Sequence, residues 1–309
     1  MKVSGDGKAF ATATAAAFGA TKFEIKPILR MPAQPAEPTM ALTATQAATW
    51  LSVTGAMTDA DHPWDAAHRL LAPGQPFATA GVGNIEAVEP NLAQGWFDDA
   101  KENELLDEAK FCAFDPQDDS GHQATGPGLA WNFGDNFSEL NAARLRVGDK
   151  LAAITIAHLD TGFDPDHITR PVNLAGTDLQ RNFVDDGFPS NDASDHTPPD
   201  MKFARSRGHG TGTLSLLAGN KLDGSTPGWA GFSGFVGVAP TAKIIPVRIA
   251  NWVVRFTTGT MVQGFDHAHT TGAHVLAMSM GGVSSQALVD AVNVAYDAGL
   301  VMVTAAGNN

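Results

Sequence analysis

The 309-residue chain carries 33 acidic and 20 basic side chains, which gives a formal net charge of −13. With 43% hydrophobic and 17% charged residues, it has the composition of a globular protein with room for about two domains. The basic residues form no stripe, so we do not expect nucleic acid as a partner. No apolar run approaches the roughly 18 residues that a membrane span needs, so we do not expect a membrane as a partner either. The single cysteine, Cys112, excludes an internal disulfide and a cysteine-rich metal site.

The first part of the chain predicts a tail, a small domain and a linker. We expect a flexible Ala/Thr tail over residues 1–20, with no convincing signal peptide, and the compartment stays open. Residues 21–94 predict a small α+β domain and residues 95–148 a linker. The elements expected in the small domain are strands over Thr21–Met31 and Ile85–Asn91 and helices over Thr43–Val53 and Pro63–Leu71.

From residue 149 to residue 309 the chain alternates apolar strands with helical segments. Such alternation is typical of βαβ units and predicts an α/β fold, a parallel sheet with helices on both faces. The expected strands are Ile154–Leu159, Ala242–Ile249, His274–Met280 and Leu300–Ala305. The expected helices are Thr211–Ala218, Thr260–Thr271 and Ser285–Ala298.

Asp160 ends the first of these strands and is followed by Thr161 and Gly162. Ligands bind at the carboxyl edge of such sheets, and a carboxylate there can accept the Nδ1–H of a histidine. An ordinary strand-ending turn is one alternative. The Asp-Thr-Gly of aspartic proteases is another, but those enzymes need a second such carboxylate, and no second copy occurs in an equivalent context.

His209 opens a predicted helix within Gly208-His209-Gly210-Thr211-Gly212, where a histidine can act as general base and then as general acid. Asn308 directly follows Gly307 at the end of the last predicted strand. The plainer alternatives are a lone surface histidine and a turn asparagine, and Asn309 competes with Asn308 for the same role.

The order of Asp160, His209 and Asn308 over residues 152–309 resembles the subtilisin-like serine peptidases, or subtilases. The resemblance implies that Asp160 and His209 are the acid and base of a triad and that Asn308 donates to the oxyanion. It also implies that the backbone of a peptide substrate pairs with the segment Ser279, Met280 and Gly281. The segment Ala305, Ala306 and Gly307 would form one wall of the pocket that receives a substrate side chain.

The chain departs from the family pattern in two places. Gly212 stands where the family usually has a second histidine, and the following residues are less typical. The Gly-Thr-Ser segment that holds the nucleophile does not occur. We therefore expect a serine-type endopeptidase that acts on peptides or proteins without a cofactor, with its serine beyond Asn309 and with the present chain inactive by itself. A noncatalytic pseudoprotease that binds peptides is the alternative.

Two further expectations concern the N-terminal domain and calcium. The Val88-Glu89-Pro90-Asn91 end resembles subtilase propeptides, which implies an inhibitory or chaperone module in cis, although an unrelated domain is the alternative. Thr169 stands where many subtilases have a calcium-binding aspartate. An acidic loop could hold a hard cation, although a solvated loop is favoured, and no histidine spacing predicts a transition-metal site. The loop residues are Asp185, Asp186, Asp192 and Asp195.

Overall fold

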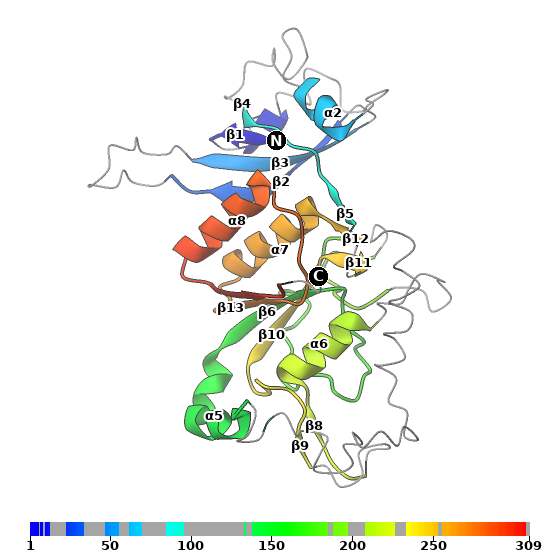
Figure 1. Cartoon of the computed structure of the whole chain (residues 1–309), viewed down its shortest axis with the longest axis vertical. Coiled ribbons are helices and arrows are strands. Elements are labelled where there is room, and N and C mark those ends of the chain that lie inside the picture. The colour runs from blue at the N-terminus through cyan, green and yellow to red at the C-terminus, as the bar shows by residue number, and fades with distance from the viewer. Residues whose placement is uncertain are drawn as a thin grey trace, which may run out of the picture. The chain divides into compact units, whose positions relative to one another are not determined.

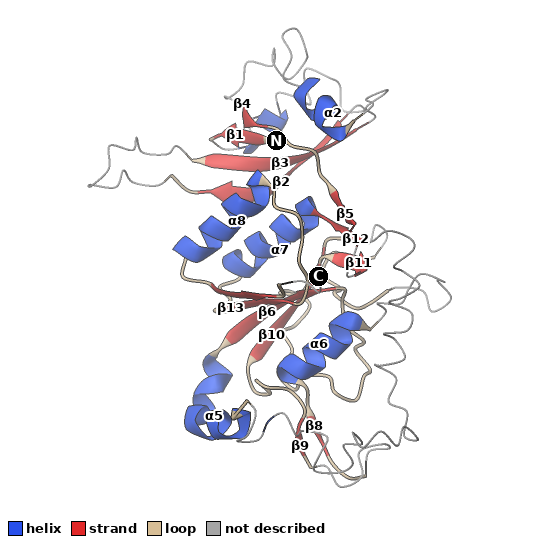
Figure 2. Ribbon diagram, viewed as in Figure 1, coloured by secondary structure: helices blue, strands red, loops and turns tan. Residues whose placement is uncertain are grey.

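The computed structural model describes eleven stretches of the chain, coloured in Figure 1 and Figure 2. These are residues 1–12 without 6 and 9, 23–33, 47–55, 62–69, 85–95, 133, 138–184, 188–196, 208–225, 233–252 and 255–306. The chain forms two compact units. The first contains residues 1–94, 257–270 and 282–299, and the second contains residues 95–256, 271–281 and 300–309. The boundaries expected near residues 20, 94 and 148 stay predictions.

The first unit is built on a four-stranded antiparallel sheet in the order β2-β3-β1-β4. Two helices, α7 and α8, pack against β2 and against each other. The strands are β1 (Lys2–Ser4), β2 (Phe23–Met31), β3 (Ala48–Gly55) and β4 (Ile85–Ala87). The helices are α2 (Pro63–Arg69), α7 (Thr258–Thr270) and α8 (Gln286–Asp297).

Two expectations for this region are wrong. The tail predicted over residues 1–20 begins with β1, an interior strand in which Val3 is fully buried. The helix predicted over Thr43–Val53 is replaced by β3, which pairs with β1 and with β2. Alanine content suggested a helix, but β-branched and aromatic side chains fit a strand with neighbours on both sides, and that pairing prevails. The predicted helix at Pro63 is confirmed as α2.

The second unit contains a five-stranded sheet in the order β14-β13-β6-β10-β7, in which every pair is parallel. The predicted α/β fold with a parallel sheet is therefore confirmed. The strands are β6 (Thr155–Asp160), β7 (Arg181–Asn182), β10 (Lys243–Arg248), β13 (Val275–Met278) and β14 (Val301–Thr304). The ends of β6, β10, β13 and β14 agree with those of the predicted strands to within two residues, and the very short β7 was not predicted.

Shorter elements complete the described chain. The helical ones are α5 (Leu140–Val147), the 3-10 helix η2 (Gly148–Ala153) and α6 (His209–Ala218). The strands are β5 (Ala93–Gly95), β8 (Lys221–Leu222), β9 (Gly234–Phe235), β11 (Ala250–Trp252) and β12 (Arg255–Thr257). Among the described residues, no helix is both long enough and apolar enough to cross a membrane.

Helix α6 packs against β6 and forms one apolar core of the second unit. Ile156 of β6 belongs to the same buried cluster as Leu214 and Ala218 of α6. Alternate residues of a strand point to one face, so Ile156, His158 and Asp160 all point toward this helix. The packing that buries Ile156 thereby fixes where the last residue of β6 meets the first turn of α6.

Candidate active site

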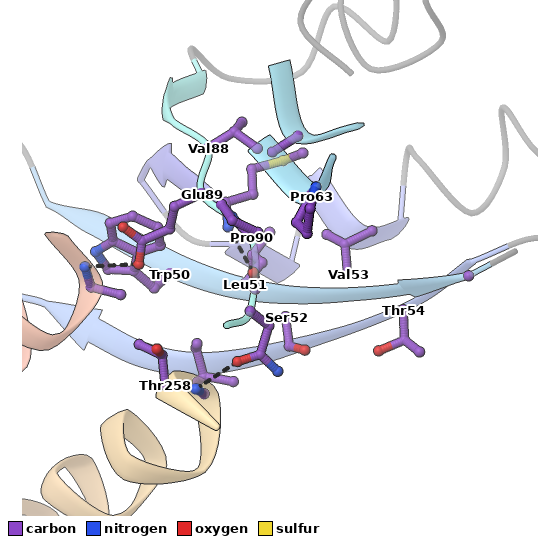
Figure 3. A pocket seen from close by; sticks show the side chains of 17 residues that line it. Trp50, Leu51, Ser52, Val53, Thr54, Pro63, Val88, Glu89, Pro90 and Thr258 are labelled. Carbon is purple, nitrogen blue, oxygen red and sulfur yellow. Dashed lines mark hydrogen bonds between the residues drawn. The ribbon is translucent and has the colours of Figure 1, made fainter. Parts of the chain in front are cut away.

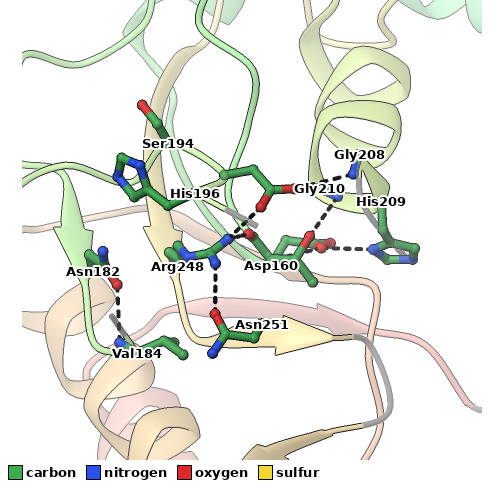
Figure 4. A network of polar contacts seen from close by, with 12 residues as sticks. Asp160, Asn182, Val184, Ser194, His196, Gly208, His209, Gly210, Arg248 and Asn251 are labelled. Atoms are coloured by element: carbon green, nitrogen blue, oxygen red, sulfur yellow. Dashed lines mark hydrogen bonds and ion pairs between the residues drawn. The ribbon is translucent and has the colours of Figure 1, made fainter. Parts of the chain in front are cut away.

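Asp160 is the last residue of β6, the central strand of the parallel sheet, and it is fully buried. His209 is the first residue of α6. The carboxyl ends of parallel strands share one edge, so the strand end and the helix start meet at the edge where α/β proteins bind ligands. Figure 4 shows the imidazole of His209 pointing at the carboxylate.

The contact between the two side chains is a short hydrogen bond. His209 Nδ1 lies 2.7 Å from Asp160 Oδ1, which also accepts the backbone N–H of Thr161 at 2.7 Å. Burial alone raises the pKa of the Asp160 carboxyl, but the hydrogen bond from His209, the charges of nearby imidazoles and the Thr161 N–H lower it below 3.8 overall. The carboxylate is therefore ionised at neutral pH, His209 Nδ1–H is the donor, and Nε2 is left to exchange a proton.

Two glycines allow this approach. Gly162 follows the acid with φ of +98°, a left-handed conformation that favours glycine. A Cβ on Gly210, directly after the histidine, would overlap the backbone carbonyl of Gly162. The turn after Asp160 and the first turn of α6 therefore pack backbone to backbone, and a larger residue at either position would separate acid from base.

A buried ion pair between Arg248 and Asp195 contacts both the turn after Asp160 and the start of α6; Figure 4 labels Arg248. Arg248, fully buried at the end of β10, donates to the Thr161 carbonyl and lies 3.0 Å from Asp195 Oδ1. The other oxygen of Asp195 accepts the N–H of Gly208 at 3.2 Å. Arg248 also donates to Asn251 Oδ1 at 2.7 Å. Through Asp195, Arg248 thus links the turn after Asp160 to the residue before His209.

Arg248, His158 and Thr213 also belong to this site, although no sequence motif marked them. His158 Nε2 lies 2.9 Å from Thr213 Oγ1, which donates to Asp160 Oδ2 at 2.9 Å. The signal was present in the spacing, because His158 stands two residues before Asp160 on one strand face and Thr213 stands four residues after His209 on one helix face. Asp195, expected as a solvated or calcium-binding carboxylate, is instead bonded to Arg248.

The predicted substrate segments lie side by side. Ser279 is exposed and follows β13, and the neighbouring backbone of Ala305 donates to the Met278 carbonyl at 3.1 Å. Met280, the next residue, is buried. Ala305 and Ala306 are exposed. Gly307 and Asn308, the predicted pocket wall and oxyanion donor, lie outside the described residues.

Metal ligands are not gathered anywhere in the part of the chain that the structure describes, where no group of three His, Cys, Asp or Glu side chains could hold an ion. At the position where many subtilases have a calcium ligand, Thr169 is buried and hydrogen-bonds to His167 and Ser215. Asp185 and Asp186 of the acidic loop lie outside the described residues.

A second concave site lies within the first unit (Figure 3). This cleft of about 390 Å³ is lined by Trp50, Leu51 and Val53 among others. Among its lining residues Glu89 is the one with an ionisable side chain, and its carboxylate already accepts the backbone N–H groups of Gln286 and Ala287. The other titratable group at the cleft is the α-amino group of Met1, whose pKa burial lowers to about 6 and which donates to the Leu51 carbonyl at 3.0 Å. Neither group is hydrogen-bonded to a second titratable side chain among these contacts, whereas Asp160 and His209 are bonded to each other.

Comparison with known proteins gives one family. The model of the subtilase family, Peptidase_S8, matches residues 152–309. Thermitase of Thermoactinomyces vulgaris is 34% identical over 155 residues, which cover 50% of this chain and 47% of thermitase. Subtilisin DY of Bacillus licheniformis is 38% identical over 103 residues, which cover 33% of this chain and 34% of that protein.

A solved structure of a cold-adapted subtilisin-like serine proteinase is 26% identical, with a TM-score of 0.37, and the match covers 50% of this chain and 46% of that one. The chain thus spans less than half the length of these similar proteins.

Proposed function

Because the chain belongs to the subtilase family through residues 152–309, we propose that it carries the acid and base of a serine-type endopeptidase. The observation that carries the proposal is the 2.7 Å hydrogen bond between the buried Asp160 carboxylate and His209 at the carboxyl edge of a parallel sheet. A carboxylate held in this way fixes the imidazole tautomer and stabilises the imidazolium that forms during acyl transfer.

In the proposed reaction, His209 Nε2 takes the proton of a serine hydroxyl while the serine oxygen attacks the scissile carbonyl carbon. Asn308 donates its side-chain N–H to the oxyanion of the tetrahedral intermediate. The imidazolium then gives its proton to the leaving amine as the C–N bond breaks, which leaves an acyl-enzyme. Water repeats the sequence, with His209 again as base, and releases the acid product.

The nucleophile is proposed to lie C-terminal to Asn309, because no Gly-Thr-Ser segment occurs in residues 1–309. The substrate is a peptide that adds a strand beside Ser279–Gly281, a segment that begins with the exposed Ser279, and such strand addition is a general mode of peptide recognition. A pseudoprotease that uses this strand only for binding is the second candidate. The intact acid–base pair favours the enzyme, because a binding protein has no need of a buried carboxylate bonded to a histidine.

The N-terminal segment is proposed to act in cis as a propeptide-like module. Glu89 accepts the N–H groups of Gln286 and Ala287 at 2.9 and 3.1 Å, at the start of α8. Asn91 accepts the N–H of Gly259 at 2.8 Å, at the start of α7. Both helices lie within the family match and both capping residues lie before it. The segment therefore stabilises two helices of the proposed peptidase.

Proteolysis by the gene product extended past Asn309 tests this function. We expect the extended protein to cleave casein, and the His209→Ala and Asp160→Asn variants to lose activity by at least a hundredfold, since triad members act as a unit. The His68→Ala variant, which removes an exposed histidine from α2, should match the unmodified protein. An extension that lacks a serine in a Gly-Thr-Ser context, together with peptide binding and no cleavage, would favour the pseudoprotease.

A further inference from the structure

The second oxygen of Asp160 has its own hydrogen-bond donor. Thr213 Oγ1 lies 2.9 Å from Asp160 Oδ2, and His158 Nε2 lies 2.9 Å from the same hydroxyl oxygen. His158 Nε2 is 3.7 Å from Asp160 Oδ2, too far for a direct hydrogen bond. The three side chains thus form a line from histidine through threonine to carboxylate.

The secondary structure makes this line a continuation of the acid–base pair. His158 and Asp160 are two residues apart on β6 and share a face, while His209 and Thr213 are four residues apart on α6 and share another. When the helix packs on the strand, Asp160 meets His209 and His158 meets Thr213. The second pair is therefore held one helical turn behind the first.

The positions of the protons on Thr213 and His158 follow from the number of donors and acceptors that meet at the Thr213 hydroxyl. The Thr213 hydroxyl has one hydrogen, and its candidate acceptors are Asp160 Oδ2 at 2.9 Å, an unprotonated His158 Nε2 at 2.9 Å and the Gly210 carbonyl at 3.2 Å. The ionised carboxylate is the strongest acceptor of the three. With its hydrogen directed there, the threonine oxygen accepts from His158, so His158 carries its proton on Nε2.

The charge of His158 is set by its surroundings. Its side chain is 5% exposed, and burial lowers the pKa of His158 below 6.5, opposed by the Asp160 charge and assisted by that of His209. The charged groups that act on it are Asp160 on its own strand and His209 on α6, while the neighbouring strand β10 presents Pro246. On the other side β13 presents Ala277. His158 is therefore neutral at pH 7.

We propose that His158 and Thr213 are positioning residues that hold the second oxygen of Asp160 and so keep its first oxygen directed at His209. This role rests on the proposed function of Asp160 and His209. Without the hydroxyl, the carboxylate loses one of its bonded donors and is freer to rotate about its terminal torsion. A misdirected carboxylate lowers the rate of proton transfer and leaves substrate binding unchanged.

The first test needs no nucleophile and uses the 309-residue chain with ¹⁵N-labelled histidine. Long-range proton–nitrogen correlations report the tautomer of each ring, and the His158→Gln variant assigns the His158 signals. We expect His158 as the neutral Nε2–H tautomer at pH 7, with a titration midpoint below 6.5. In Thr213→Val the His158 signals should shift, and in Thr213→Ser they should stay. The Nδ1–H tautomer, or unchanged signals in Thr213→Val, would overturn the proposal.

The second test measures peptide hydrolysis by the extended protein. Thr213→Val, which keeps the shape and removes the hydroxyl, should lower kcat about tenfold with KM unchanged, the scale expected for one lost bond to a charged group. Thr213→Ser should restore kcat to within about twofold, which a purely structural role of the methyl group would not predict. Equal kcat for the two variants would contradict the proposal. If the extended protein has no activity at all, the proposed function fails and the NMR result still decides the positioning role.

Discussion

At the scale of single residues, the site depends on small side chains as much as on the charged ones. Asp160 and His209 were predicted from the sequence because Asp-Thr-Gly and His-Gly-Thr are local signals, and the structure places the two side chains in a hydrogen bond. Arg248 and Thr213 could not be found with equal ease, because their role arises only when β10 and α6 are packed around β6. Thr213 lies four residues after His209 on α6, and its contact with Asp160 can be predicted only once it is known which face of α6 packs on β6.

The glycines of α6 give a matched test. Gly210→Ala should destabilise the fold and break the Asp160–His209 bond, because its Cβ would overlap the Gly162 carbonyl. Gly212→Ala has no atom within 4 Å of the added methyl and should stabilise the helix by up to about 1 kcal/mol. Urea unfolding gives the two stabilities and His209 ring NMR reports the bond. Equal effects of the two substitutions would contradict the close packing.

The stability of the chain should fall on acidification in two steps. The folded-state pKa of His158 is lowered, so below about pH 6.5 the unfolded chain binds the extra proton and stability falls as pH drops toward that lowered value. The pKa of Asp160 is also lowered, so its contribution is present above pH 3.8 and is lost as pH falls further. His158→Gln should flatten the dependence below pH 6.5, measured by urea unfolding. A slope unchanged by this substitution would argue against a buried neutral His158.

At the scale of elements, the strands of the parallel sheet were predictable because each is a short apolar run between turn signals. β3 was mistaken for a helix and β1 was missed, because a three-residue strand has no periodicity and its identity comes from its neighbours. The Glu89-Pro90-Asn91 segment was noticed for its resemblance to propeptides. Its physical role, capping α8 and α7, needed the structure.

Those caps should contribute measurable stability. Glu89→Ala and Asn91→Ala each remove a side-chain acceptor from the N-terminus of a helix, at a cost of about 0.5–2 kcal/mol in the free energy of unfolding. Glu89→Gln should recover part of the loss, because its amide oxygen still accepts while the favourable charge at the helix start is gone. Glu24→Ala, in an exposed ion pair with Lys26, is the control and should change stability little.

At the scale of the whole molecule, the subtilase match covers residues 152–309, but the two compact units do not follow its boundary, because residues 257–270 and 282–299 of the match belong to the first unit. The domain boundary expected from the sequence near residue 149 stays a prediction. The sequence did not predict that α7 and α8, which lie within the family match, would cluster with the N-terminal sheet. That grouping arises from long-range contacts of β2 with the two helices, which no local pattern encodes.

If this N-terminal segment is propeptide-like, it should act when supplied as a separate chain. A peptide of residues 1–94 should inhibit the extended enzyme, from which that segment has been removed, at micromolar concentration. The same peptide with Glu89→Ala and Asn91→Ala should inhibit more weakly, because the capping contacts with α8 and α7 are lost. Absence of inhibition by the unmodified peptide would reduce the segment to an accessory domain.

Labelling by a serine-directed fluorophosphonate reports whether Asp160 and His209 activate a serine that lies outside residues 1–309, as we propose. We expect the protein extended past Asn309 to be labelled at one serine, and the His209→Ala variant of that protein to be unlabelled. The 309-residue chain should also remain unlabelled. Labelling of the 309-residue chain, or of the extended protein without His209, would contradict the account.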